Sequence, residues 1–329
     1  IHEVRSQYNR VFTSVGTDEI AQEEFLLEDP HYKLSDDENR FLNDSISEQE
    51  ILDAILSFKP NKSPGLDGLG IEFYLEHKIV LVPVLKRLFD QIFVEKCLTS
   101  SMYSGVISQI YKGEKEKSVL SNWRPLCMLN VDSKILMTKV LTNRLKNVMQ
   151  ILVHPDQTCA VPGRDIRDGI NLIHNVIHYS NIHELNAILL SVDHMRAFDI
   201  IEWSYIEKTL RYFNIGERFI DWFNIIYKID HIKSCVQVNG HLSKNIFPTR
   251  GIRQGCPLSP FLYVLASETL TQYFRNTHIS VKGLNILGKD YKITNYADDT
   301  NFFVQDFSSI SQILNIYKLY QKASGATLK

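Results

Sequence analysis

Hydrophobic and polar positions along the chain follow two different periods in different stretches. Where apolar residues recur every three or four positions we expect helices, and where apolar and β-branched residues form short runs we expect strands. The predicted helices cover residues 47–56, 73–96, 132–149 and 308–323, and the predicted strands cover 105–111, 187–192, 234–238, 241–247, 292–297 and 300–304. Helices and strands mix irregularly, without an internal repeat, which favours the α+β class.

Residues with strong preferences for helix ends sharpen several boundaries. Ser47 opens a capping box before the first predicted helix, and Ser308 and Gly325 are residue types that begin and end a helix, here the last one. Pro83 is expected to bend the second helix. A further helix should begin near Pro257, because proline suits the first helical position.

The stretches between these elements carry turn signals. Asn239-Gly240 is the strongest hairpin signal in the chain, the Gly- and Pro-rich residues 59–70 predict a loop, and the polar residues 112–122 predict a mobile loop. Residues 1–44 are acidic and weakly periodic, and we interpret them as a peripheral extension.

Composition is that of a large folded enzyme. The chain has 329 residues, 44% of them hydrophobic, enough for a sizeable core in two subdomains. No run of eighteen apolar residues and no signal peptide or other targeting signal occurs, so we expect an intracellular protein, in the nucleus or cytoplasm, that does not span a membrane. The five cysteines lack C-x-x-C spacing, which predicts reduced thiols and no zinc site.

Charge is unevenly distributed. The net charge is −2, but residues 1–50 hold 13 acidic and 4 basic side chains, a net −9, so the remaining 279 residues carry a net +7. A mildly basic body suits a groove that follows a phosphate backbone, although ordinary surface charge fits the same counts.

Three carboxylates give the strongest chemical signal. Asp298 and Asp299 stand between two strand-like runs, so they fall at the bend of a tight hairpin, and Asp193 follows the strand predicted at 187–192, which we expect to be buried. Carboxylate oxygens are the ligands that Mg²⁺ prefers, and two ions held by such acids can activate a hydroxyl and stabilise a leaving pyrophosphate. Taken alone, Asp-Asp is also common turn chemistry.

Further motifs occur in a fixed order around these acids. They are Lys62-Ser63-Pro64-Gly65-Leu66-Asp67-Gly68, Asn122-Trp123-Arg124-Pro125-Leu126, Val161-Pro162-Gly163-Arg164, Asp193-His194-Met195-Arg196-Ala197-Phe198-Asp199, Arg250-Gly251-Ile252-Arg253-Gln254-Gly255-Cys256-Pro257 and Tyr296-Ala297-Asp298-Asp299. In this order they resemble the reverse transcriptase of non-LTR (LINE-type) retrotransposons, over residues 45 to 329.

The resemblance implies a right-hand polymerase with an antiparallel palm sheet flanked by helices. It places the fingers at 45–185 and the palm at 186–329, truncated before the thumb, after the extension at 1–44. The implied activity is RNA-directed DNA polymerase, which adds deoxynucleotides to a primer 3′-hydroxyl with two Mg²⁺ ions, or Mn²⁺ in their place. The implied partners are an RNA template, a DNA primer or target and deoxynucleoside triphosphates.

The resemblance also implies roles for individual residues. Asp193 and Asp298 are the metal-binding catalytic acids, and Asp299 is a supporting ligand. The other implied residues are Lys112 and Arg124 at the triphosphate, Phe198 beneath the sugar, where a ring excludes a 2′-hydroxyl, Gln254 and Gly255 at the nucleotide, and Gly163 and Arg164 at the template. Core packing for Phe198 and surface solvation for Lys112 and Arg124 are the structural alternatives.

Departures from the family pattern keep other functions open. Arg196 replaces a usual Lys, Cys159-Ala160 a usual Gly-Phe pair, and Tyr111 a usual Pro, while the palm lysine of the family is not identified in the sequence. An inactive nucleic-acid-binding relic and an RNA-dependent RNA polymerase are the alternatives. His174 and His178 are better explained as packed histidines than as zinc ligands, and the glycines at 65, 68 and 70 lack a P-loop ending.

Overall fold

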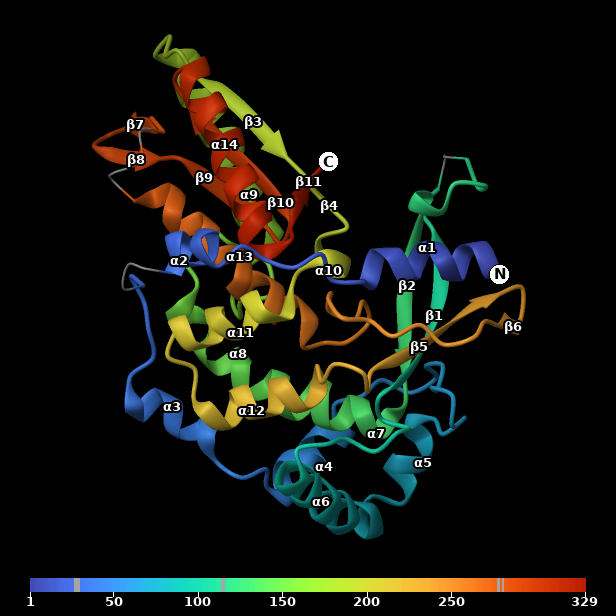
Figure 1. The fold of residues 1–329 in the computed structure, drawn as a ribbon. Coiled ribbons are helices and arrows are strands. Elements are labelled where there is room, and N and C mark those ends of the chain that lie inside the picture. Colours follow the sequence, from blue (N-terminus) through green and yellow to red (C-terminus); the bar gives the residue numbers. More distant parts are fainter. Residues whose placement is uncertain (27–29, 114–115, 277–278, 280) are drawn as a thin grey trace.

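The computed structural model describes residues 1–26, 30–113, 116–276, 279 and 281–329 (Figure 1). Its helices are α1 (His2–Phe12), α2 (Glu19–Leu26), α3 (Asp36–Asn43), α4 (Glu48–Leu56), α5 (Ile71–Glu76), α6 (Lys78–Glu95), α7 (Val131–Lys134), α8 (Leu141–Leu152), α9 (Ile166–Ile182), α10 (Ala197–Ile200), α11 (Trp203–Tyr212), α12 (Glu217–Ile226), α13 (Ser259–Arg275) and α14 (Phe307–Ser324), with a 3₁₀ turn η1 (Leu120–Asn122) and a π-helical turn η2 (Ile135–Val140).

The strands are β1 (Ser104–Tyr111), β2 (Trp123–Leu129), β3 (Ile188–Val192), β4 (His194–Met195), β5 (Lys233–Val238), β6 (His241–Leu242), β7 (Leu284–Ile286), β8 (Lys289–Tyr291), β9 (Ile293–Tyr296), β10 (Asp299–Val304) and β11 (Thr327–Leu328). They form one sheet of order β2-β1-β5-β6, one of order β3-β10-β9, and the pairs β11-β4 and β7-β8. The mixture confirms the α+β prediction.

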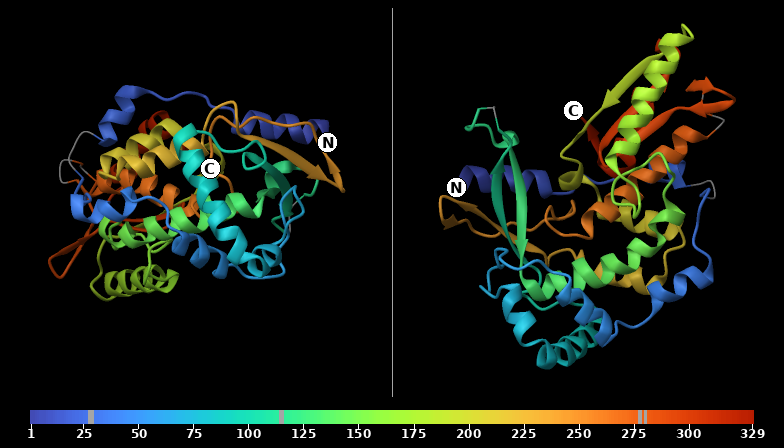
Figure 2. Two further views of the ribbon diagram at one scale, coloured as in Figure 1. Left: turned by 90° about the horizontal axis from the view of Figure 1, so that it is seen from below. Right: turned by 180° about the vertical axis from the view of Figure 1, so that it is seen from behind.

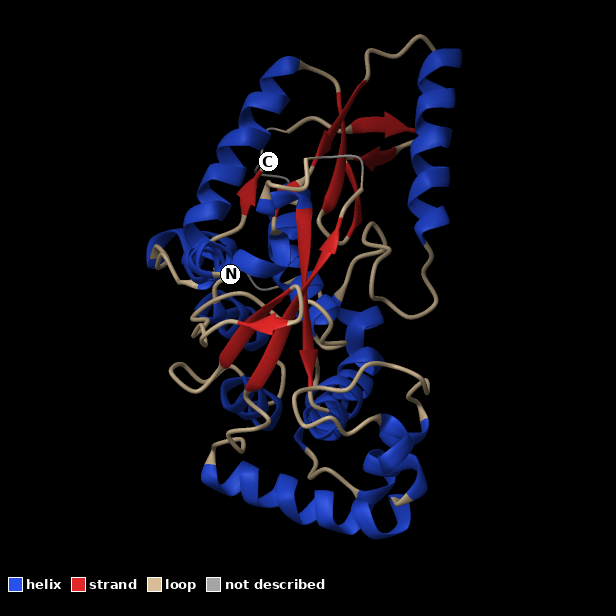
Figure 3. Ribbon diagram, turned by 90° about the vertical axis from the view of Figure 1, so that its right-hand side faces the viewer, coloured by secondary structure: helices blue, strands red, loops and turns tan. Residues whose placement is uncertain are grey.

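The β3-β10-β9 sheet is antiparallel throughout and has helices on both faces (Figure 3). On one face, Phe302 of β10 packs against Tyr317 of α14 and Phe274 of α13. On the other face, Phe303 clusters with Val176 of α9. This alternation follows from the side-chain period of two in a strand, and it matches the predicted palm sheet flanked by helices.

β3 differs from the prediction in its burial. It was expected to be a buried strand, but it lies at the edge of its sheet, and Leu189 is 42% exposed. One side of β3, with Leu190, packs against the core, and the other side, with Leu189, is exposed. The strand therefore carries Asp193 at the margin of the sheet and not in its centre.

Two helix starts and one helix break also differ from the predictions. Asp306, not Ser308, caps α14, because the extended backbone at Asp306 lets its carboxylate accept from the Ser309 N–H at 2.8 Å. α13 begins at Ser259, with proline in its first turn supplied by Pro260 and not Pro257. The interruption between α5 and α6 lies at His77, and the predicted bend site at Pro83 is inside α6.

Other predicted elements are confirmed. Ser47 forms a capping box at α4, Gly325 ends α14 with φ of 78°, and β5 and β6 pair across Asn239-Gly240. The long helix predicted at 132–149 is present as α7, η2 and α8 in succession. In the predicted loop 112–122, residues 114 and 115 lie outside the described part of the chain.

The N-terminal segment (residues 1–26) is packed onto the body. Tyr8 of α1 and Phe25 of α2 are buried, and Phe25 contacts Tyr273 and Tyr320 with ring centroids 4.7 and 5.3 Å apart. The Gln22 amide donates to the Ala323 carbonyl at 3.1 Å. The segment was predicted to be a peripheral extension because it is acidic and only weakly periodic. It nevertheless has apolar residues that pack against the rest of the protein.

The β1–β2 hairpin and the part that contains β3, β9 and β10 project in the same direction from a helical body, with the C-terminus between them (Figures 1 and 2). One large hydrophobic core runs through that body, from α4 and α6 to α13 and α14. Among the described residues, no helix combines the length and apolar character needed to cross a membrane.

Candidate polymerase active site

The β9–β10 hairpin places the two adjacent acids. Tyr296 pairs with Asp299, so Ala297 and Asp298 form the turn, and Ala297 adopts φ of 54°. A positive φ is costly for alanine, and Gln157 compensates by binding both sides of the turn. Its Oε1 accepts from the Ala297 N–H at 3.0 Å, and its Nε2 donates to the Ala297 carbonyl at 3.4 Å. The sequence analysis did not identify Gln157.

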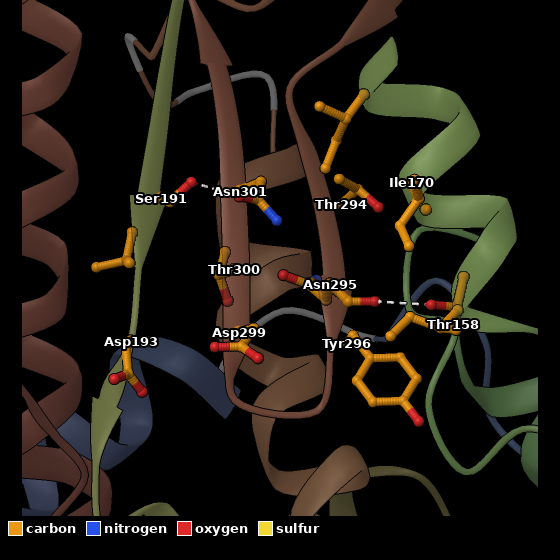
Figure 4. Close-up of a pocket in the computed structure, with 14 residues that line it drawn as sticks. Thr158, Ile170, Ser191, Asp193, Thr294, Asn295, Tyr296, Asp299, Thr300 and Asn301 are labelled. Carbon is orange, nitrogen blue, oxygen red and sulfur yellow. Dashed lines mark hydrogen bonds between the residues drawn. The ribbon is translucent and has the colours of Figure 1, made fainter. Parts of the chain in front are cut away.

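β3 brings the third acid to the same place. Thr300 pairs with Val192, so Asp193 at the end of β3 and Asp299 at the start of β10 are neighbours. In Figure 4 Asp193 and Asp299 lie side by side on neighbouring strands, and both line a cavity of about 330 Å³ between the sheet and α9. Burial, with the negative charges of Asp299 and Asp193, raises the pKa of Asp298. The three predicted acids therefore lie together.

Lys329 forms an ion pair with one of these carboxylates, that of Asp193. β11 pairs with β4, which follows Asp193 directly, and this pairing brings the Lys329 Nζ to 2.8 Å from Asp193 Oδ2. The Lys329 N–H also donates to the Asp193 carbonyl at 3.0 Å. The ion pair with Asp193 raises the pKa of Lys329. No sequence motif had identified this contact, which depends on a two-residue strand.

The two predicted finger cations lie on or next to the β1–β2 hairpin. Arg124 of β2 is exposed, and its charge opposes the rise in the pKa of Asp298, so the guanidinium acts on the acidic cluster. Lys112 follows β1 and donates from Nζ to the Ser121 carbonyl at 2.9 Å. Its charge acts on a different acid, Asp199. The cations thus approach the site from the side opposite the acid-bearing sheet.

Phe198 and the segment after residue 250 form the floor next to the acids. Phe198 is half-buried, and its ring stacks on Tyr263 at 4.9 Å with 23° between the planes. The Ile252 N–H donates to the Phe198 carbonyl, and the Gln254 amide donates to Asp199 Oδ1 at 2.8 Å. Gly255 has φ of 101°, and a Cβ there would lie 2.9 Å from the Cys127 carbonyl oxygen, so this glycine allows the segment to approach the backbone of β2 closely.

Gly163 and Arg164 lie in the turn before α9. Gly163 has φ of 76° and is exposed. Arg164, however, is directed inward, since its guanidinium donates to the carbonyls of Val153, His154 and Gln157 at 2.6–2.9 Å. The predicted contact of Arg164 with template phosphate is therefore not supported by this geometry. Arg164 holds the loop that contains Gln157.

The acids fit a magnesium site by their chemistry. They supply hard oxygen ligands. Burial, and after it the charges of Asp299 and Asp193, raise the pKa of Asp298, and a bound cation would favour the ionised form of these acids. Within the described residues, no group of three or more His, Cys, Asp or Glu side chains is arranged to hold an ion by itself.

Comparison with known proteins identifies the family. Residues 112–329, more than half of the chain, match the model of the reverse transcriptase (RNA-dependent DNA polymerase) family. The uncharacterised 149 kDa protein of transposon TX1 from Xenopus laevis is 32% identical over 326 residues, which are 98% of this chain and 24% of that protein. The Pol polyprotein of the type-2 retrotransposable element R2DM from Drosophila melanogaster is 23% identical over 284 residues, 82% of this chain and 24% of that protein.

Among solved structures, an apo telomerase from Candida tropicalis, truncated from its C-terminal domain, has a TM-score of 0.48 and 9% identity, with 74% of this chain and 54% of that chain covered. The chain spans about a quarter of the length of the two transposon relatives. On the family match and these relatives, the chain belongs to the reverse transcriptase family and is a reverse transcriptase domain of the non-LTR retrotransposon type.

Proposed function

We propose that the chain is the core of an RNA-directed DNA polymerase that extends a DNA primer on an RNA template with deoxynucleoside triphosphates. The observation that carries this proposal is the meeting of Asp193, Asp298 and Asp299 at the ends of two paired strands, opposite the exposed Arg124. Negative charge on one side and a cation on the other suit a triphosphate whose phosphates bind metal and guanidinium together.

Asp193 and Asp298, with Asp299 in support, would hold two Mg²⁺ ions or Mn²⁺, which supply Lewis acidity to the attacking and leaving oxygens. The chain's own side chains do the rest. Arg124 binds triphosphate oxygens through parallel N–H donors, and Lys112 adds a point charge at the same side. Phe198, fixed by its stacking on Tyr263, supports the sugar and leaves no room for a 2′-hydroxyl.

We assign residues 45–185 to the fingers, 186–329 to the palm and 1–44 to an extension in contact with both. Gly163 remains a candidate for close approach of the template, because it is exposed beside the cavity and lacks a side chain. Copying of RNA into DNA for a retrotransposon places the protein inside the cell, in the nucleus or cytoplasm.

The test is primer extension by the full-length protein that carries this chain, with Mg²⁺, an RNA template and either deoxy- or ribonucleotides. We expect extension with deoxynucleotides, and we expect Asp193→Asn and Asp298→Asn each to abolish it, since each removes a metal-binding charge without changing side-chain shape. Asp299→Asn should cause a smaller loss.

Asp37→Asn is the matched control, because the Asp37 side chain is 93% exposed on α3, away from the site. Circular dichroism and thermal melting show whether each variant is folded. Extension at the wild-type rate by folded Asp193→Asn or Asp298→Asn would contradict the site assignment. A wild-type protein that binds template and primer but adds no nucleotide would instead indicate a binding relic, and a preference for ribonucleotides an RNA polymerase.

A further inference from the structure

Asp199 is a buried acid whose carboxylate has one hydrogen-bond partner, Gln254, among the described residues. It follows Phe198 directly, its residue is 2% exposed, and its Oδ1 accepts from Gln254 Nε2 at 2.8 Å. Burial raises the pKa of Asp199 to about 6, while Arg196, Gln254 and Lys112 act in the opposite direction. A buried carboxylate is costly to ionise, and such groups are concentrated at functional sites.

The hydrogen bond between Gln254 and Asp199 is built on a rigid frame. The Gly251 N–H donates to the Ile201 carbonyl at 2.8 Å, and the Ile252 N–H donates to the Phe198 carbonyl at 2.7 Å. A Cβ on Gly251 would lie 2.4 Å from the Asp199 carbonyl oxygen, so the two backbones are in direct contact. The Gln254 carbonyl in turn accepts from the Cys127 N–H of β2 at 2.7 Å. The segment that carries Gln254 is therefore fixed to α10 on one side and to the fingers strand β2 on the other.

An ionised carboxylate decides which way a glutamine amide faces. A side-chain amide has a donor NH₂ and an acceptor oxygen of similar shape, and it can be turned over without a change in volume. An ionised carboxylate only accepts hydrogen bonds, so Gln254 must direct Nε2 toward Asp199 and Oε1 away from it. Asn at position 199 would offer both a donor and an acceptor and would permit either orientation.

We infer that Asp199 is a positioning residue for nucleotide binding, which holds the Gln254 amide so that Oε1 is presented as a hydrogen-bond acceptor to a hydroxyl donor on the incoming nucleotide. This inference rests on the proposed function, because it assigns an orientation to a residue of that same site. In this role Asp199 acts through Gln254, because its carboxylate is buried and accepts from the Gln254 amide.

The surroundings of Asp199 favour this role over a purely structural one. The charged and titratable groups that face it are Arg196 at the start of α10, Lys112 beyond β1, and Tyr8 of α1. The Tyr8 hydroxyl makes no hydrogen bond among the described residues, and burial raises its pKa to about 12. If the Asp199 carboxylate served only to attach α1 to the body, we would expect it to accept a hydrogen bond from the Tyr8 hydroxyl. It accepts instead from Gln254, which we assign to nucleotide binding.

The test compares Asp199→Asn, Gln254→Ala and the double variant in the full-length protein, by steady-state primer extension with the deoxynucleotide concentration varied. We expect Asp199→Asn to raise the KM for deoxynucleotide about three- to tenfold, the value of one hydrogen bond, with kcat within about twofold and the KM for primer–template unchanged. Because Asp199 acts through Gln254, Asp199→Asn should add no further loss in the Gln254→Ala background. Asp37→Asn serves as the surface control.

The outcomes separate the inference from the proposed function. A wild-type protein without extension activity overturns the proposed function and the inference with it. Activity in the wild type with an unchanged KM in folded Asp199→Asn overturns the inference alone. So does a loss in the double variant equal to the product of the two single losses, because independent effects would mean that Asp199 does not act through Gln254.

Discussion

At the scale of single residues, the same carboxyl group should have opposite effects on stability and on nucleotide binding. The pKa of Asp199 is about 6 in the fold against an ordinary value of 3.8, so the folded state disfavours its ionised form. This penalty is present above pH 6, is relieved as the pH falls from 6 towards 3.8, and is absent below that range. Asp199 therefore lowers the free energy of unfolding at neutral pH.

Asp199→Asn should consequently be more stable than the wild type at pH 7.5, by up to about 3 kcal/mol. Urea denaturation at several pH values measures the difference, which should shrink as the pH is lowered from about 6 to about 4. A difference that stays constant over this interval would mean that the carboxyl group does not titrate there. A stabilised variant with a raised KM would show a site that is kept at a cost in stability.

Phe198→Val tests sugar selection. If the ring excludes a 2′-hydroxyl by its volume, Val should raise the ratio of ribonucleotide to deoxynucleotide kcat/KM by at least about tenfold, measured on one primer and template. The control is Phe307→Val, since Phe307 is 79% exposed at the start of α14. If the ratio of ribonucleotide to deoxynucleotide kcat/KM is unchanged in an active Phe198→Val protein, then Phe198 does not select the sugar and only packs against Tyr263.

At the scale of elements, the features that could be predicted from the sequence are those that depend on residues close to one another in the chain. The Asp-Asp hairpin, the capping box at Ser47 and the turn at Asn239-Gly240 depend on residues close in sequence, and all are present. Contacts made through tertiary structure were not predictable in this way. Arg164 looked like a phosphate ligand by type, but three carbonyls of a neighbouring loop bind it.

The same distinction explains the site. Asp193 was recognised because a strand precedes it, whereas its ion pair with Lys329 joins residues 136 positions apart and requires β11 to pair with β4. Gln157 supports the turn at Ala297 from 140 residues away in sequence. Such long-range partners have no periodicity or spacing that a single sequence displays.

The start of α14 offers a prediction at this scale. Asp306→Ala should lower the Tm, because it removes the acceptor for the Ser309 N–H, and Ser308→Ala should have little effect. Hydrogen bonds from the Ser309 N–H and its side chain lower the pKa of Asp306 to about 2. The contribution of Asp306 should thus be full above pH 3.8 and be lost as the pH falls towards 2. Equal effects of the two substitutions on the Tm would restore Ser308 as the cap.

At the scale of the whole molecule, the question is whether residues 1–26 belong to the cooperative unit. Phe25 is 4% exposed against Tyr273 and Tyr320, whereas Ile20 on the same helix is 80% exposed. We expect Phe25→Ala to lower the free energy of unfolding by about 3–5 kcal/mol and Ile20→Ala to leave it nearly unchanged. Urea denaturation followed by far-UV circular dichroism provides the measurement.

Two results would argue for a separate extension. One is a neutral Phe25→Ala, and the other is a first unfolding phase, well before the main transition, that affects only a small part of the helical signal. A single transition shifted in Phe25→Ala would show that the N-terminal segment and the palm unfold together.

The attachment of Gln22 to Ala323 has a consequence for biosynthesis. The two residues are 301 positions apart. During translation, about 300 further residues must therefore be synthesised after α2 before the part of α14 that contacts it has been made. During this interval Phe25 lacks the contact with Tyr320 that α14 supplies, and exposed apolar surface on a nascent chain is where chaperones bind and aggregation begins. A product whose translation stops before α14 would keep that surface exposed permanently, and we expect it to be removed by the cell's degradation machinery and not to accumulate as a partial polymerase.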